Sequence, residues 1–347
     1  MTRRLSVYST YAPQAGSTRV RIYDWLKHLG LDANAHQYLG LPTAGVRDVA
    51  SRPIAVARAE RSLRERASSR DCVLISREAS PLSRGQIEER LLREATHGVL
   101  DMDDALFHDS SPHRRLLGGA AKFERAAAAS DIFVAGSQYI AEWAAAHARR
   151  VELIPSCVEP RDYRVSRGTA GDGPERMIWV GSASTEAYLV PLIDDLLRLH
   201  ERRGARLRLV SSAQHNPALE PLQNMMDRVP WQFSTAVDEL AQADVALAPL
   251  HDTLFARGKC AYKLLQYGAA GVPAVGSPVG ANELALQRLD GVAVGPADSW
   301  YEALTEVLDG SDARRAARSA RARKAVEEHY SFRAWAHTWK ACVMPDA

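Results

Sequence analysis

Short apolar runs alternate, along the first half of the chain, with stretches whose apolar residues recur at helical spacing. The apolar runs lie at residues 5–9, 71–76, 98–102, 132–135 and 151–155. Their length fits buried strands, and the stretches between them predict helices. Strand, loop and helix repeated in this order are typical of a doubly wound α/β domain with a parallel sheet.

The same pattern restarts in the second half. Four more apolar runs predict strands, at residues 177–180, 207–211, 245–249 and 273–276. After the first of them, a loop of small residues precedes a predicted long helix that ends at about Arg203. We therefore predict two Rossmann-like domains. Their bounds are residues 1–160 and 176–330, with a Pro/Gly-rich linker at 161–175 and a last helix at 331–347.

Composition limits the class of protein. The chain has 347 residues, of which 46% are hydrophobic and 25% charged, as in ordinary globular proteins. A net charge of +2 gives no overall field for binding nucleic acid. The four cysteines lie far apart without CxxC spacing, which indicates free thiols of a cytoplasmic protein. No apolar run approaches the ~20 residues of a membrane span, whereas peripheral contact with a membrane stays open.

The stretch RGKCAYKLLQYGAAGVPAVGSPVGAN, residues 257–282, carries the most chemistry. It predicts a helix from Lys259 to about Ala270, with Lys259, Lys263 and Gln266 on one face. Two ammonium groups and a helix N-terminus preceded by Gly258 suit an anionic ligand, because the first N–H groups of a helix are unpaired. The alternative is an amphipathic helix whose lysines are solvated.

This stretch resembles the donor site of retaining glycosyltransferases of the GT-B fold, the family numbered four. A subset of that family has K-x-x-x-K-L-L-Q-Y and S-P-V-G-x-N, as this chain has from Lys259 to Asn282. Many other members carry two glutamates where this chain has Gly258 and Gln266. The resemblance implies two Rossmann-like domains facing a central cleft, with a C-terminal helix crossing back to the N-terminal domain.

The resemblance also implies the activity, which is transfer of a sugar from a nucleoside-diphosphate sugar to a small-molecule or glycan acceptor, with retention. No cofactor is expected, and no metal is needed if cationic side chains stabilise the leaving phosphate. The residues expected at the catalytic centre are Lys259, Asp103, Asp104 and Arg257. The residues expected around the donor are Gly16, Ser17, Arg19, Gly181, Ser182, Ser184, Gly258, Lys263, Gln266, Val279, Gly280 and Asn282.

Two further segments lie at predicted strand ends. The first loop ends in GSTRVR, which places Arg19 and Arg21 in the first turns of a helix, as ligand-binding or as surface arginines. DMDDALF, residues 101–107, follows another strand. Its three carboxylates would repel one another unless they are solvated, bound to metal or faced by hydrogen-bond donors. Asp103 and Asp104 could instead cap a following helix. By resemblance, we expect them to contact sugar or acceptor hydroxyls.

The loop at 181–185 departs from the family pattern. Common members place an arginine and a lysine just after it, whereas Glu186 and Ala187 follow here. Charge on the diphosphate must then be balanced by other cations. Two rivals stay open, and the missing glutamates favour the second of them. One is an epimerase or phosphorylase of the same architecture, and the other is a non-catalytic sugar-nucleotide-binding protein.

Overall fold

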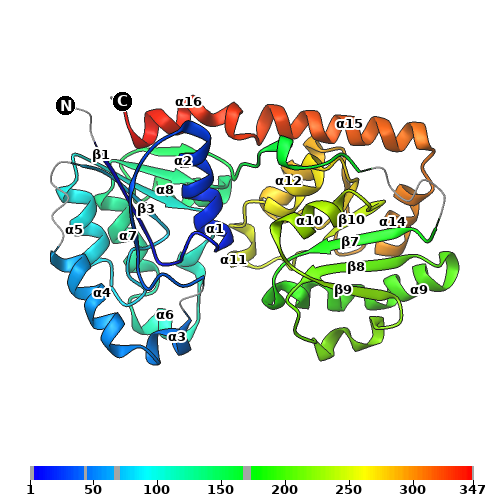
Figure 1. Cartoon of the computed structure of the whole chain (residues 1–347), viewed down its shortest axis with the longest axis horizontal. Helices are drawn as coiled ribbons and strands as arrows, with labels where there is room; N and C mark the ends of the chain where they lie inside the picture. The colour runs from blue at the N-terminus through cyan, green and yellow to red at the C-terminus, as the bar shows by residue number, and fades with distance from the viewer. Residues whose placement is uncertain (1–3, 43–44, 66–70, 167–172, 346–347) are drawn as a thin grey trace. The chain divides into compact units, whose positions relative to one another are not determined.

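Parallel strands form the frame of both halves of the chain in a computed structural model (Figure 1). The structure describes residues 4–42, 45–65, 71–166 and 173–345; part of the predicted linker, 167–172, lies outside them. The chain divides into two units. The N-terminal unit comprises Met1–Ser156, Thr253–Cys260 and Trp335–Ala347, and the C-terminal unit comprises Cys157–Asp252 and Ala261–Ala334.

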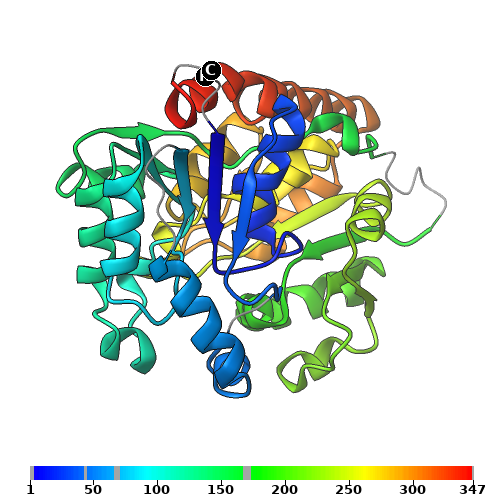
Figure 2. The ribbon, with the colours of Figure 1, turned by 60° about the vertical axis from the view of Figure 1, so that its left-hand side comes forward.

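The N-terminal unit holds a six-stranded parallel sheet in the order β2-β1-β3-β4-β5-β6 (Figure 2). Its strands are β1 Arg4–Ser9, β2 Asn34–Gln37, β3 Asp71–Ser76, β4 His97–Met102, β5 Ile132–Ala135 and β6 Val151–Leu153. Its helices are α1 Gly16–Thr18, the π-helix η1 Arg19–Tyr23, α2 Asp24–Leu29, α3 Val46–Ala50, α4 Pro53–Glu65, α5 Gln86–Glu94, the 3-10 helix η2 Leu106–His108, α6 Pro112–Leu116, α7 Ala120–Ala129, α8 Gln138–Ala145 and α11 Leu254–Arg257. The last helix, α16 Phe332–Val343, packs on this unit through Trp339, whose ring stacks on Trp25 at 5.2 Å.

The C-terminal unit holds a second parallel sheet in the order β12-β11-β10-β7-β8-β9. Its strands are β7 Arg176–Val180, β8 Arg206–Ser211, β9 Met226–Pro230, β10 Val245–Ala248, β11 Ala274–Gly276 and β12 Val292–Ala293. Its helices are η3 Pro160–Asp162, η4 Ala183–Leu192, α9 Ile193–Arg203, η5 Pro217–Leu222, α10 Phe233–Leu240, α12 Tyr262–Ala269, α13 Ala281–Arg288, α14 Trp300–Leu308 and α15 Asp312–His329, with η3, η4 and η5 of 3-10 type.

Both faces of the second sheet are buried, which explains the unbroken apolar strands. In β7, Met177 and Trp179 belong to one core cluster, and Ile178 and Val180 belong to the other. Side chains alternate between faces along a strand, so a strand covered on both faces is apolar throughout. The predicted α/β fold with two doubly wound parallel sheets is confirmed.

Two predicted helices differ from the structure. The helix expected after the loop at 181–185 is the 3-10 helix η4 followed by α9, and Pro191 lies inside η4. Proline lacks the N–H that an α-helix needs there. The helix predicted from Lys259 begins only at Tyr262, because Ala261 has φ +54°, outside the helical region. Gly258 packs against Ala105, and a Cβ there would overlap it.

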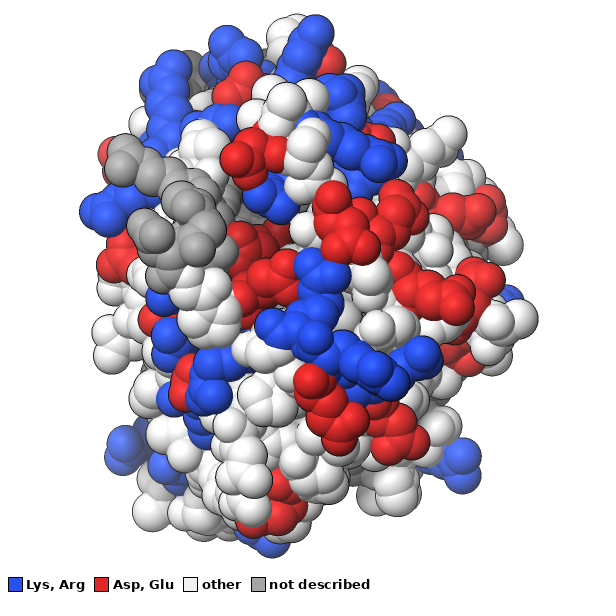
Figure 3. Space-filling model, turned by 90° about the vertical axis from the view of Figure 1, so that its right-hand side faces the viewer, with Lys and Arg blue, Asp and Glu red and all other residues white. Residues whose placement is uncertain are grey.

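Charged side chains of both signs are mixed on the face of the C-terminal unit drawn in Figure 3. On α15, Arg318 and Arg321 both pair with Asp290, at 3.4 and 2.6 Å. Ion pairs at a protein surface contribute little stability. Among the described residues, no helix is long and apolar enough to cross a membrane.

A buried ion cluster follows β3. The Glu78 carboxylate accepts hydrogen bonds from Arg114 at 2.6 and 2.7 Å and from Lys122 at 2.6 Å. Lys122 is 2% exposed and also donates to the Ser80 carbonyl oxygen. Burial alone would raise the pKa of Glu78, but Lys122 and Arg114 lower it to about 2.

We expect Glu78→Gln to lower the free energy of unfolding by roughly 3–5 kcal/mol, because it leaves two buried cations without their partner. Urea unfolding at pH 7 measures this, with the exposed Glu94→Gln as control. A lowered folded-state pKa stabilises above the unfolded value of 4.5 and is lost as pH falls toward about 2. The parent should therefore lose stability across that window more steeply than Glu78→Gln. Equal unfolding energies would contradict the cluster's role.

Candidate active site

The order of strands marks one edge of the C-terminal sheet. From β7 the chain continues to β8 and β9 on one side, whereas β10 and the later strands lie on the other. Ligands of open parallel sheets bind at the carboxyl ends of the strands where the order reverses. The loop that begins at Gly181 follows β7, and Leu250 and His251 follow β10. The predicted donor residues Gly181, Ser182 and Ser184 therefore lie at the switch point.

Lys263 lies beside this loop. Its Nζ is 4.0 Å from the centre of the Trp179 ring, a cation–π contact, and a Cβ on Gly181 would lie 2.8 Å from the same nitrogen. Only glycine fits there. Helix α12, which carries Lys263 in its first turn, is fixed by Tyr267: its hydroxyl accepts from the Val180 N–H and donates to the Leu247 carbonyl.

The hydroxyl groups of the loop are exposed and bonded to one another. Ser182 Oγ is 3.0 Å from Ser184 Oγ, and the Ser182 N–H donates to Thr185 Oγ1 at 3.2 Å. The Gly181 N–H donates to the Val210 carbonyl oxygen, so it serves the sheet. The hydroxyls of Ser182 and Ser184 can exchange their mutual bond for bonds to phosphate oxygens.

Glu186, which departs from the family pattern, directly follows this loop and is held by several hydrogen bonds. Its buried carboxylate accepts from Arg228 at 2.7 Å, from Ser211 at 2.6 Å and from Asn216 at 2.9 Å. Burial would raise the pKa of Glu186, but the hydrogen bonds from Arg228 and its neighbours hold it below the usual range. The sequence did not show that this carboxylate joins the segment after β7 to the end of β8 and to Arg228 in β9.

A second loop follows β11. Gly280 has φ +57° and directly precedes α13, in which Asn282 is buried. The Leu250 N–H donates to Ser277 Oγ at 3.1 Å, which ties this loop to the end of β10. The structure thus brings Val279, Gly280 and Asn282 to the same sheet edge as the loop at Gly181.

Gln266 is 4% exposed. Its Nε2 donates to the Tyr163 hydroxyl at 3.2 Å, which orients the amide. Within the described part of the chain, no hydrogen-bond donor contacts its carbonyl oxygen.

In the N-terminal unit the switch point lies between β1 and β3. Gly16 and Ser17 begin the helix after β1, and Arg19 pairs with Asp24 at 3.2 Å. Neither reading of Arg21 was right, because its side chain is 1% exposed. It binds both oxygens of Asp101 at 2.8 Å and donates to the Ile154 carbonyl oxygen.

Arg77, which follows β3, was missed by the sequence analysis. Its φ is +66°, a left-handed conformation that a non-glycine residue rarely adopts. Its Nη1 donates to Ser17 Oγ at 3.0 Å, its Nε lies 3.2 Å from Asp103 Oδ1, and its Nη2 pairs with Asp104. No sequence pattern indicates a strained arginine, although its place after a buried strand could have drawn attention to it.

Each carboxylate of the DMDD segment is therefore faced by a cation. Of the three alternatives that the sequence left open, facing donors is the arrangement found. Among the described residues, no group of three or more His, Cys, Asp or Glu could hold a metal ion. Burial raises the pKa of Asp103 to about 6, with Asp104 adding to the rise and Arg77 opposing it.

The predicted single face of Lys259 and Lys263 is wrong. Lys259 belongs to the N-terminal unit, where its Nζ lies 3.8 Å from Asp104 Oδ1 and 5.3 Å from the centre of the Phe255 ring. Lys263 belongs to the C-terminal unit. The segment between them is not helical, because Cys260 Sγ donates to the Asp103 carbonyl and holds it on the N-terminal unit. Arg257 ends α11 and is exposed.

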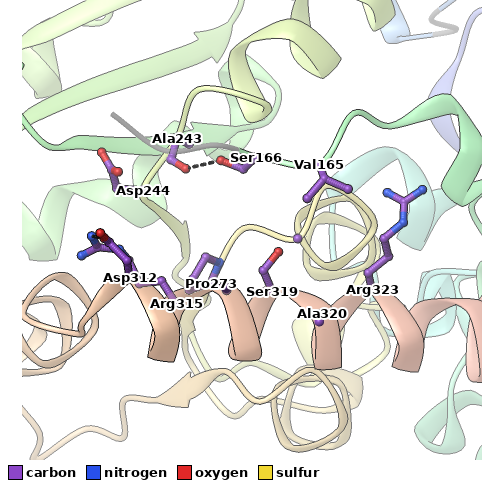
Figure 4. A pocket seen from close by; sticks show the side chains of 12 residues that line it. Val165, Ser166, Ala243, Asp244, Pro273, Asp312, Arg315, Ser319, Ala320 and Arg323 are labelled. Atoms are coloured by element: carbon purple, nitrogen blue, oxygen red, sulfur yellow. Dashed lines mark hydrogen bonds and ion pairs between the residues drawn. The ribbon is translucent and has the colours of Figure 1, made fainter. Parts of the chain in front are cut away.

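A pocket of about 530 Å³ lies elsewhere in the C-terminal unit (Figure 4). Asp244 and Pro273, which line it, directly precede β10 and β11, so the pocket is at the amino ends of these strands. Arg323, on its wall, already donates to the carbonyl oxygens of Ala269 and Pro160. The pocket is thus at the opposite sheet edge from the predicted donor residues.

Residues 174–310 match the family described as glycosyl transferases group 1. A search of curated proteins by sequence finds no match. Among solved structures, the alpha,alpha-trehalose 6-phosphate synthase from Burkholderia multivorans is 14% identical with a TM-score of 0.66, and the alignment covers 99% of this chain and 97% of that one. WaaG, a glycosyltransferase involved in lipopolysaccharide biosynthesis, is 13% identical with a TM-score of 0.68, and 98% and 99% are covered.

A third structure, HepE of Anabaena in complex with UDP and glucose, is 13% identical with a TM-score of 0.66, and 98% of each chain is covered. At this identity the structures show a shared fold, which is GT-B. The GT-B fold and the glycosyl transferases group 1 match at residues 174–310 together mark the chain as a glycosyltransferase.

Proposed function

We propose that the chain transfers a sugar from a nucleoside-diphosphate sugar to an acceptor hydroxyl, with retention and without a metal ion. The observation that carries the proposal is the position of Lys263. It lies in the first turn of α12, over Trp179 and beside Gly181, at the switch point of the C-terminal sheet. The HepE structure holds UDP and glucose, which supports a nucleotide-sugar donor.

The chemistry needs a stabilised leaving group. The bond between the sugar C1 and the phosphate oxygen breaks, the acceptor oxygen bonds to C1, and the acceptor proton passes to the released diphosphate. Negative charge therefore grows on the diphosphate. The ammonium group of Lys263 and the positive end of the α12 helix dipole oppose that charge, and both are fixed before the reaction begins. Retention is what the family resemblance implies.

Nucleoside diphosphate should stabilise the protein without divalent metal, because cationic side chains balance its charge. UDP at 100 times its dissociation constant should add about 2.7 kcal/mol to the free energy of unfolding, seen as a higher Tm. EDTA should leave the shift unchanged, and uridine should give a smaller one because it lacks phosphates. A shift that disappears with EDTA would mean that a metal holds the diphosphate.

Lys263→Met and Lys259→Ala should separate binding from turnover. Loss of Lys263 removes a charged contact to the diphosphate, worth roughly 1.5–3 kcal/mol, so UDP should bind about 10- to 100-fold more weakly. Lys259→Ala should leave UDP affinity unchanged but lower turnover by roughly 2–4 kcal/mol of barrier. Calorimetry with UDP and steady-state kinetics measure the two effects. Unchanged UDP affinity in Lys263→Met would place the diphosphate elsewhere.

We propose that the side-chain carbonyl oxygen of Gln266 accepts a hydrogen bond from a ribose hydroxyl, while its amide group donates to the Tyr163 hydroxyl. Gln266→Leu should weaken UDP binding by roughly 1–3 kcal/mol, because a ribose hydroxyl loses its partner. Tyr163→Phe, the matched control, removes only the hydroxyl that orients the amide and should cost less. Both are measured by titration calorimetry. If Gln266→Leu binds UDP as the parent does, the ribose lies away from Gln266.

A further inference from the structure

Arg77 holds a backbone conformation that has to be stabilised by its surroundings. At φ +66°, a non-glycine residue is strained by about 1–3 kcal/mol, and such residues gather at functional sites. Its own N–H donates to the Asp101 carbonyl at 2.7 Å, which fixes the residue where β3 and β4 end. The strain directs the side chain along the carboxyl edge of the N-terminal sheet, at its switch point.

The guanidinium group joins two loops. It contacts Ser17 from the loop after β1, and Asp103 and Asp104 from the segment after β4. Arg77 Nε and Asp103 Oδ1 are both buried without a hydrogen-bond partner among the described residues, although they form an ion pair with each other. The cation thus holds Asp103 by charge and Asp104 by a direct hydrogen bond.

The three carboxylates differ in exposure. The side chains of Asp101, Asp103 and Asp104 are 3%, 13% and 21% exposed. Asp104 is therefore the one nearest to solvent, between Arg77 and Lys259. Two cations and two carboxylates give this cluster no net charge. A carboxylate accepts hydrogen bonds from hydroxyls, and a neutral cluster has no excess cation to favour a phosphate.

We infer that Arg77 is a positioning residue that holds Asp104 to accept a hydrogen bond from a hydroxyl of a neutral sugar, the acceptor, on the N-terminal unit. The inference rests on the proposed function and deepens it, because it assigns an acceptor class and a residue that supports its recognition.

The pH dependence of transfer on its acidic side, here called the acid limb, tests the role of Arg77. Loss of packing alone would not change this limb. The groups facing Asp103 are Arg21, Arg77, Asp101, Asp104 and the thiol of Cys260; Lys259 faces Asp104. The pKa of Asp103 is about 6, raised first by burial and opposed by Arg77. Protonation of Asp103 would release Arg77, so transfer should fall below about pH 6. Arg77→Gln removes the group through which Asp103 acts, so the transfer that remains should no longer show this acid limb.

The experiment uses UDP-glucose as donor and glucose or glucose 6-phosphate as acceptor probe, with UDP release as the readout. Arg77→Gln should lower kcat/KM for glucose by about 10- to 100-fold, with the loss mainly in KM for glucose, and should abolish the acid limb. Arg77→Lys keeps the charge and should hold the limb near its place. Asp104→Asn, at a more exposed position, should lose glucose transfer even if Arg77→Gln folds poorly. Arg125→Gln, a surface variant in the same unit, is the control.

UDP affinity, measured by calorimetry, separates the two proposals. A parent that binds none of UDP, GDP and ADP contradicts the proposed function itself. A parent that binds UDP but transfers only to glucose 6-phosphate, or to neither sugar, overturns the neutral-sugar assignment. Variants of Arg77 and Asp104 that match the parent in glucose transfer, or an acid limb that stays in place in Arg77→Gln, overturn the positioning role.

Discussion

The buried ion pair between Arg21 and Asp101 is the contact on which the N-terminal half of the candidate site depends. Arg21 comes from the helix after β1, Asp101 from the end of β4, and the same guanidinium binds a carbonyl beyond β6. Removing one partner of such a pair leaves an uncompensated charge in the interior, which is strongly destabilising. Arg21 thereby ties the helix after β1 to the ends of β4 and β6. Asp103 and Asp104 follow Asp101 in the segment that Arg21 holds.

In the C-terminal unit the buried charge that holds strand ends together is negative. There a carboxylate, Glu186, is buried, and Arg228 with two neutral donors surrounds it. Its consequence is local order in the loop at Gly181, which leaves the cation near that loop to come from α12. Lys263 supplies it. The cation beside this loop therefore stands on α12 and not directly after the loop, where Glu186 and Ala187 lie.

The strands could be predicted wherever burial on both faces makes the sequence apolar throughout, as at residues 132–135 and 177–180. Strand β2, Asn34–Gln37, was missed because its half-exposed edge position demands no apolar residues. The separation of Lys259 from Lys263 depends on the positive φ of Ala261, and alanine otherwise favours helices. Arg77 was missed for a similar reason, since its conformation is imposed by contacts distant in sequence. Local pattern therefore located the sheet edges but not the side chains that long-range contacts bring to them.

The N-terminal unit takes its last helix from residues that follow the C-terminal unit. Trp339 stacks on Trp25, and the Cys342 carbonyl contacts His97 at 2.7 Å. During synthesis, Trp25 therefore lacks its stacking partner until the whole C-terminal unit has been translated. Because domains tend to fold as their sequence emerges, the C-terminal unit can complete its core first, although it begins later. Completion of the N-terminal unit therefore requires residues that follow the C-terminal unit.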